Sequence, residues 1–438
     1  MRRFARAFLA VGLLVSPGVA QAQEVPLSQF LTRFFSPDNP LVLKDTGHSA
    51  HFASQAEARD SLDTLNRNIA YQLASFPLGS SSGGFTFTLD PAAGVLTRSA
   101  ESFGPLFAER GLTAGKGKLT IGANYSHSTF DKFEGRDLND GSIRLILTHN
   151  DIDGSGDNLT PFFEGDIINA NLFLKLQTDT FAAFANYGLT DRFDVGVAVP
   201  LVRVKMDARF HTTLRRLATE GDFFLFHVFN NDTLESDNFE SGDSSGIGDV
   251  VVRGKLNLAR KEFGDVAAAV DFRLPTGDDQ NLLGAGAVQA KFFLIASGSS
   301  KKSFSPHLNL GYTFTGESDT LGKLPDELNY AVGFDAAAGR KLTITGDFVG
   351  RTLLDATRVV ETERTFRFNR RPPAPIQSIT DTVLTTETGK LNLLLGSAGV
   401  KFNPGGRLLF SANLLFSLSQ NNGLQDKITP VFAIDYNF

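Results

Sequence analysis

The sequence of 438 residues predicts an all-β fold, a transmembrane antiparallel up-and-down β-barrel, on three observations. Long segments from about residue 118 alternate apolar and polar residues, the chain ends in an alternating strand closed by an aromatic residue, and the first 22 residues have the layout of a secretory signal peptide. No run of about 18 or more apolar residues follows residue 22, which excludes a helical membrane span. The mean hydropathy of -0.07 agrees with a barrel, because lipid-facing and lumen-facing residues cancel in the average.

Composition narrows the chemistry that the chain can perform. There is no Cys, so disulfides, Cys-based metal sites and thiol nucleophiles are excluded. The 42 Lys and Arg are outnumbered by 48 Asp and Glu, and no basic patch is present, so we expect no nucleic-acid partner. We also expect no enzymatic activity, no cofactor and no metal site, since no set of residues has the spacing of a catalytic or metal-binding motif.

The N-terminal residues 1–22 predict export. Arg2, Arg3 and Arg6 form a positive region, residues 8–15 are apolar, and Ala-Gln-Ala at 20–22 fits a signal-peptidase site. Together with the barrel, this predicts a location in the bacterial outer membrane, with membrane lipid, lipopolysaccharide and the barrel-assembly machinery as partners.

The length of the alternating segments separates a barrel from a soluble β-sandwich. The alternation is clearest at residues 119–126, 307–314, 328–335 and 408–418. Sandwich strands typically run about five or six residues, whereas these run about ten to twenty, enough to cross a bilayer at a tilt. In a barrel the polar face lines the lumen, and we expect lumen charges there. The predicted lumen charges are Arg253, Lys255, Asp271, Arg273, Asp335 and Asp347.

The C-terminus resembles the assembly signal of outer-membrane barrels. Counting back from the end, one face of the last strand carries Phe438, Tyr436, Ile434 and Phe432. Frayed polar termini are the rule in soluble proteins, so this pattern favours a membrane barrel.

Turn lengths predict the number of strands. Short turns at 188–192, 260–264, 297–302, 339–341 and 403–406 alternate with longer polar stretches near 131–166, 206–247, 276–286, 316–326, 355–382 and 419–426. Barrels alternate short periplasmic turns with longer outer loops, so this order predicts twelve strands. The expected strand starts are near residues 118, 167, 193, 248, 265, 287, 304, 327, 341, 383, 405 and 427. The apolar phase of the second strand shifts around Thr178–Thr180, where we expect a bulge.

Residues 23–117 precede the barrel, which we place at 118–438. An amphipathic pattern at about 54–75, with Leu62, Leu65, Ile69 and Leu73 on one face, predicts a helix. Residues 85–89 and 95–98 read as short strands. We expect a partly helical plug-like or periplasmic segment, and the alternative is that the two strands extend the barrel to fourteen.

Three segments carry a family resemblance: YGLTDRFDVGVAVPL at 187–201, GIGDVV at 246–251 and FRLPTG at 272–277. They resemble the outer-membrane family named for the meta pathway of phenol degradation, related to the transporters for long-chain fatty acids and aromatic hydrocarbons, over roughly residues 85–438. The resemblance implies a barrel that lets small hydrophobic compounds through the outer membrane. The chain lacks the Asn-Pro-Ala stretch of the fatty-acid transporters, which argues against long-chain fatty acids.

The polar stretch 206–247 contains the candidate ligand-binding residues. Phe223, Phe224, Phe226 and Phe229 stand among acidic residues, and four Phe in seven positions are costly to expose. Either they fold onto the barrel rim or into lipopolysaccharide, or they form an apolar patch that captures ligand from outside.

A second candidate site is the Arg cluster in the polar stretch 355–382. Arg364, Arg367, Arg370 and Arg371 form a basic group that would hold lipopolysaccharide phosphates or attract anionic solutes.

Two functions follow from different classes. The first is a channel for passive uptake of small hydrophobic or aromatic compounds. The second is a structural or adhesive barrel with a closed lumen, or a porin for polar solutes. An apolar path through the barrel favours the first, and a lumen filled by charge pairs favours the second.

Overall fold

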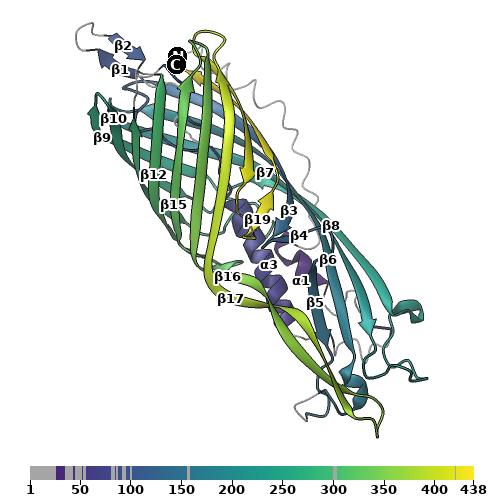
Figure 1. Cartoon of the computed structure of the whole chain (residues 1–438). Coiled ribbons are helices and arrows are strands. Elements are labelled where there is room, and N and C mark those ends of the chain that lie inside the picture. The colour runs from purple at the N-terminus through teal and green to yellow at the C-terminus, as the bar shows by residue number, and fades with distance from the viewer. Residues whose placement is uncertain are drawn as a thin grey trace.

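The computed structural model describes residues 26–34, 43–44, 52, 56–79, 84, 87–90, 95–98, 101–154, 158–298, 303–419 and 421–438. The predicted signal peptide at 1–22 lies outside these residues. The chain forms a closed antiparallel barrel, in which the first barrel strand pairs with the last (Figure 1). No helix in these ranges is both long and apolar enough to span a bilayer.

Twelve strands close the barrel, which confirms the predicted number. In chain order they are β3 (Leu119–Phe133), β6 (Ile167–Gly188), β7 (Phe193–Arg215), β8 with β9 (Glu235–Ile247 and Val251–Lys261), β10 (Gly264–Arg273), β11 (Gln289–Gly298), β12 (Phe304–Thr315), β15 (Glu327–Ala337), β16 (Leu342–Asn369), β17 (Ile376–Phe402), β18 (Leu408–Ser417) and β20 (Thr429–Asn437). The predicted short turns at 188–192, 260–264, 339–341 and 403–406 connect consecutive strands at one end of the barrel, the end at which both β3 begins and β20 finishes. Most of the fifth turn, residues 299–302, lies outside the described residues.

The remaining elements lie before the barrel in the sequence or within the segments that connect its strands. They are η1 (Leu27–Gln29), α1 (Phe30–Arg33), α3 (Ala56–Ala74), β1 (Phe87–Asp90), β2 (Val95–Arg98), β4 (Arg136–Asp137), β5 (Ile143–Thr148), η2 (Phe162–Gly165), η3 (Asn230–Asp232), β13 (Glu317–Ser318), β14 (Gly322–Lys323) and β19 (Leu424–Asp426). The predicted helix at 54–75 is α3. The two short strands pair only with each other, so the fourteen-strand alternative is wrong.

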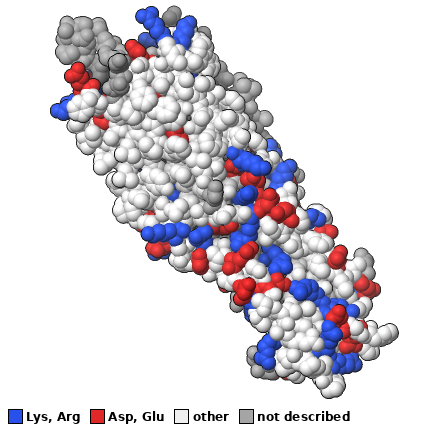
Figure 2. Space-filling model, viewed as in Figure 1, with Lys and Arg blue, Asp and Glu red and all other residues white. Residues whose placement is uncertain are grey.

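The barrel wall near the short turns has a lipid-facing surface. Outward residues such as Phe292, Leu310 and Phe348 are more than half exposed, although they are large and apolar. Figure 2 shows a broad band of this wall almost free of charged residues, with Lys, Arg, Asp and Glu gathered towards the opposite half of the molecule. A closed barrel with such a band fits the outer membrane, and its short turns then face the periplasm.

Several strands continue beyond this band and form an extension on the outer side (Figure 1). β6 shows the change most clearly, since Phe181 and Tyr187 are exposed on its outer face, whereas Leu172, Leu174 and Leu176 are fully buried on its inner face. Outside the bilayer the outer face meets water, so the apolar residues turn inward. The bulge expected at Thr178–Thr180 is therefore wrong: β6 keeps an unbroken register with both neighbours, and the apolar face switches sides instead.

The same extension corrects two of the long predicted loops. Much of the stretch 206–247 is strand, because β7 runs to Arg215 and β8 starts at Glu235. The stretch 355–382 is mostly a hairpin, since β16 runs to Asn369 and β17 starts at Ile376. The outer faces of these strand segments carry polar residues because they lie in water beyond the bilayer. The sequence of these segments therefore resembles that of loops.

The helices α1 and α3 fill the extension. Leu62, Leu65 and Ile69 of α3 are buried in one hydrophobic core with the inward Leu residues of β6, and Phe34 contacts Phe210 of β7 edge-on at 4.7 Å. Side-chain hydrogen bonds reinforce this packing: Ser61 Oγ donates to the Leu384 carbonyl at 3.0 Å, and Asn68 donates to the Thr357 carbonyl at 2.8 Å. α3 thus closes the outer half of the barrel interior.

Candidate functional site

The six predicted lumen charges all lie on inward-facing strand positions: Arg253, Lys255, Asp271, Arg273, Asp335 and Asp347. Their neighbours in the chain Val252 and Phe272 are exposed on the outer face. Arg253 and Asp271 are cross-strand partners on β9 and β10, joined by two hydrogen bonds of 2.6 Å. This pair thus lies across two neighbouring strands of the wall.

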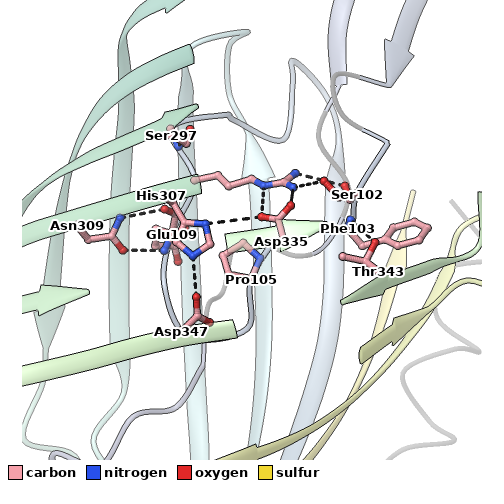
Figure 3. Close-up of polar contacts among 12 residues, drawn as sticks. Ser102, Phe103, Pro105, Glu109, Ser297, His307, Asn309, Asp335, Thr343 and Asp347 are labelled. Carbon is pink, nitrogen blue, oxygen red and sulfur yellow. Dashed lines mark hydrogen bonds and ion pairs between the residues drawn. The ribbon is translucent and has the colours of Figure 1, made fainter. Parts of the chain in front are cut away.

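Residues 101–117 pass through the lumen on the periplasmic side, and we call them the lumen plug. At its centre Arg110 forms a two-pronged ion pair with Asp335 of β15, with an Nε–Oδ1 distance of 2.9 Å (Figure 3). The side chains are 4% and 0% exposed. The adjacent Glu109 pairs with Arg253 and lies 3.6 Å from the Lys255 ammonium. The plug thus has one positive and one negative side chain, Arg110 and Glu109, and each is paired with an oppositely charged side chain of the barrel wall.

His307 of β12 lies behind this ion pair. Its Nε2 is 2.7 Å from Asp347 Oδ1 and its Nδ1 is 3.7 Å from Asp335 Oδ1, and the ring is fully buried (Figure 3). His307 thus lies between two carboxylates, one of which holds Arg110 of the plug.

Hydrogen bonds to the backbone of the plug add to its ion pairs. The Asn309 side chain both accepts from the Glu109 amide at 2.8 Å and donates to the Glu109 carbonyl at 2.9 Å. The Gly111 amide donates to Ser297 Oγ at 3.0 Å, and Lys401 donates to the Pro105 carbonyl at 2.8 Å. The plug is bound to several different strands, so its release has to break all of these contacts.

A cavity of about 190 Å³ lies in the lumen between the plug and the end of α3; we call it the lumen cavity. Its apolar lining includes Leu78, Phe107 and Leu393, and its polar lining includes Lys291 and Glu327. An engineered cavity of about 150 Å³ in another protein binds benzene, so this one has room for a single aromatic ring with a small substituent.

The strand beside the lumen cavity is interrupted at residues 248–250, between β8 and β9, where two of the three resemblance segments meet. The Asp249 carboxylate accepts hydrogen bonds from the Gly277 amide at 3.1 Å and the Ala285 amide at 2.8 Å. Thr276 Oγ1 donates to the Gly248 carbonyl at 2.8 Å. A Cβ at Gly284 would lie 2.4 Å from Asp249, so glycine is required there. These segments fold the loop 274–288 inward against the barrel.

The four Phe of the proposed capture patch do not share one environment. Phe223 and Phe224 are 92% and 60% exposed at the outer tip. Phe226 stacks on Phe163 at 5.2 Å, and Phe229 is buried in the core of the extension. Phe229 is thus excluded from an exposed patch, because the chain turns inward after residue 226.

Ion pairs between hairpin tips hold this aromatic tip in place. Arg370 and Arg371, from the predicted basic cluster, pair with Glu220 and Asp222 of the Phe-rich segment. These two guanidinium groups are already engaged within the chain.

Further down the extension, Asp381 of β17 accepts from Arg144 of β5 and from Arg215 of β7. Burial alone would raise the pKa of Asp381, but the Thr382 amide and the two guanidinium groups outweigh it and lower that pKa. The carboxylate therefore stays charged and joins three strands of the extension.

The predicted assembly signal lies on the lipid-facing side of the last strand. Phe432, Ile434, Tyr436 and Phe438 are all 41–55% exposed. Tyr436 and Phe438 contact each other edge-on at 4.7 Å.

Sequence reasoning missed the residues that close the lumen. Glu109, Arg110, His307 and Asn309 come from segments more than 190 positions apart, and only the closed barrel brings them together. The one sequence signal was the charged Glu109–Arg110 pair in a Gly-rich and apolar segment directly before the first strand.

Comparisons with solved structures give low overall similarity. An outer membrane channel from Pseudomonas putida F1 is 12% identical, with 74% of this chain and 96% of that chain covered at a TM-score of 0.42. A Pseudomonas aeruginosa FadL homologue is 12% identical, with 82% and 96% covered at 0.33. The Ralstonia pickettii toluene transporter TbuX is 13% identical, with 84% and 99% covered at 0.29.

No curated protein matches the chain. The family comparison does give a match, and its range contains all three resemblance segments while being narrower than the 85–438 expected from them. Residues 173–352 match the family described as "Putative MetA-pathway of phenol degradation", which confirms the resemblance that the sequence motifs indicated.

Proposed function

We propose that this chain is an outer-membrane channel for the passive uptake of small hydrophobic or aromatic compounds. The observation that carries the proposal is the lumen cavity: a space of single-ring size inside a membrane barrel, with apolar side chains on one part of its lining. The family match supports it, because phenol is a compound of this size and kind.

The exposed Phe223 and Phe224 support the proposal at the outer end. Large apolar side chains at an aqueous tip attract apolar solutes, and the Phe226–Phe163 stack continues the aromatic surface towards the barrel. No covalent step is needed for passage, so the proposal requires no catalytic group and no cofactor.

A second function is favoured by one specific observation, the lumen plug. Its ion pairs and backbone hydrogen bonds fill the periplasmic half of the lumen, as a structural or adhesive barrel with a closed lumen would require. The two functions differ in whether expression changes the permeability of the outer membrane.

Uptake by whole cells distinguishes them. Cells that lack their general porins are given radiolabelled toluene or radiolabelled arabinose, with and without expression of the chain. A channel for aromatic compounds raises the initial rate for toluene and leaves arabinose unchanged, and a polar porin does the opposite. Unchanged rates for both solutes, with the barrel correctly inserted, would mean a structural barrel.

A further inference from the structure

We propose that the lumen cavity is a binding site for a small aromatic carboxylate, with Lys291 of β11 as the group that binds the carboxylate. The inference rests on the proposed function and narrows its substrate class. It comes from the charge balance of the cavity, its size and its apolar side.

Four cationic side chains line the lumen cavity, and three of them already have an ion-pair or hydrogen-bond partner within the chain. Arg253 is held by Asp271 and Glu109, Arg351 lies 3.3 Å from Glu327, and Arg273 donates to the carbonyl of Ala74 at the end of α3. Arg351 also donates to the Ser75 carbonyl at 3.1 Å, so the two arginines of the outer side cap the helix.

Lys291 is the cation left over. It lines the cavity on the inward face of β11, and among the residues that the structure describes it forms no ion pair or hydrogen bond. Its ammonium lies 4.8 Å from the centroid of the Phe293 ring, and Asp271 and Glu327 act on it only through longer-range electrostatics. An ammonium group in a confined site is stabilised by a carboxylate through charge-assisted hydrogen bonds.

Gln289, two positions earlier on the same face of β11, adds a second donor to this side of the cavity. It is 6% exposed, and its side-chain amide nitrogen has no hydrogen-bond partner among the described residues. A buried amide donor without a partner is unfavourable, and an acceptor oxygen would remove that cost. Lys291 and Gln289, on the same face of β11, are thus two donors without an acceptor. A carboxylate has two oxygens and can accept a hydrogen bond from each of them.

The rest of the lining fits an aromatic ring. Leu78, Phe107, Val349, Leu393 and Leu395 form the apolar part of the cavity. The volume of the lumen cavity is about 190 Å³. An engineered cavity of roughly 150 Å³ in another protein binds benzene, so the remaining volume is about that of one small substituent on the ring. Size and charge together point to a benzoate-like compound.

The test is salicylate binding to the detergent-purified full chain, followed by ligand fluorescence, which the Trp-free protein leaves clear. Lys291→Met removes the charge at similar length, and Lys291→Arg is the matched control that keeps it. We expect Lys291→Met to weaken salicylate binding by about 10- to 100-fold, and Lys291→Arg to stay within a few-fold of wild type. The dissociation constant of neutral benzyl alcohol, obtained from its displacement of salicylate after correction for the salicylate affinity of each variant, should be the same in all three proteins.

Two results overturn the inference: wild-type protein that does not bind salicylate, or Lys291→Met that binds it as tightly as wild type. Heat-modifiable migration on gels checks the folding of each variant, and Lys291→Gln replaces Lys291→Met if the latter fails to fold. If salicylate does not bind while toluene uptake is intact, the carboxylate inference fails and the proposed function stands. If toluene uptake fails as well, both fail.

Discussion

Replacing Arg110 by Ala tests whether the lumen plug is held by its buried ion pair. Arg110 is 4% exposed and Asp335 is fully buried, so removing the guanidinium leaves a buried carboxylate without its main partner. Breaking such a pair typically costs about 3–5 kcal/mol. At the lower end of that range, the equilibrium between docked and released plug should shift by roughly a hundredfold, at about 1.4 kcal/mol per tenfold.

Planar-bilayer recordings of single channels measure this shift directly. Wild-type protein should be closed to ions almost all of the time, and Arg110→Ala should open to ions far more often. The matched control is Arg203→Ala, which removes an exposed pair with Asp243, 59% and 55% exposed, and should change little. In the double variant Arg110→Ala with Asp335→Asn, the buried uncompensated charge is gone, and the open fraction should fall back towards wild type. An Arg110→Ala channel that opens no more often than wild type would refute this account of the plug.

Three further predictions concern the tip, the extension and the last strand. Replacing Phe223 and Phe224 by Ser should slow toluene uptake by whole cells while leaving the amount of inserted barrel unchanged, and uptake at the wild-type rate would eliminate the capture patch. Leu174→Ala opens a cavity in the core between β6 and the helices and should lower the free energy of unfolding by about 2–5 kcal/mol, measured by denaturant titration; a loss below about 1 kcal/mol would mean that this core is loosely packed. Deleting Phe438 should reduce the heat-modifiable protein in the outer membrane, because the lipid-facing end of the last strand is lost; normal amounts would show that assembly does not depend on it.

The barrel was predictable because alternation in the wall is a local property. Within the bilayer every second residue of a strand faces lipid, as Phe292 and Leu310 do, and short turns alternate regularly with longer loops. The number of strands, twelve, could therefore be predicted from the sequence. The extension was not predictable by the same rule. Beyond the bilayer the apolar residues of β6 lie on the inner face, as Leu174 does, whereas within the bilayer they lie on the outer face. In the sequence this change of face looks like a shift in the alternation or like a loop.

The site was predictable only in part, for a similar reason. Asp271 and Asp335 were placed in the lumen by strand phase alone. The partner of Asp335 is Arg110, which lies 225 positions away in a segment without regular secondary structure, where no periodicity indicates a direction for the side chain. Phe229 looked equivalent to Phe223 in sequence, but the fold of the tip buries one and exposes the other.

The most direct test of the proposed channel uses purified protein in asymmetric vesicles whose outer leaflet is lipopolysaccharide, the layer that slows apolar solutes in the cell. The measured quantity is the initial rate of toluene influx, with and without the chain in the membrane. The account predicts a faster rate with the chain, and a still faster rate with Arg110→Ala because the released plug widens the path. Equal rates for empty vesicles and vesicles carrying folded wild-type barrel would contradict the proposal that this barrel conducts small aromatic compounds.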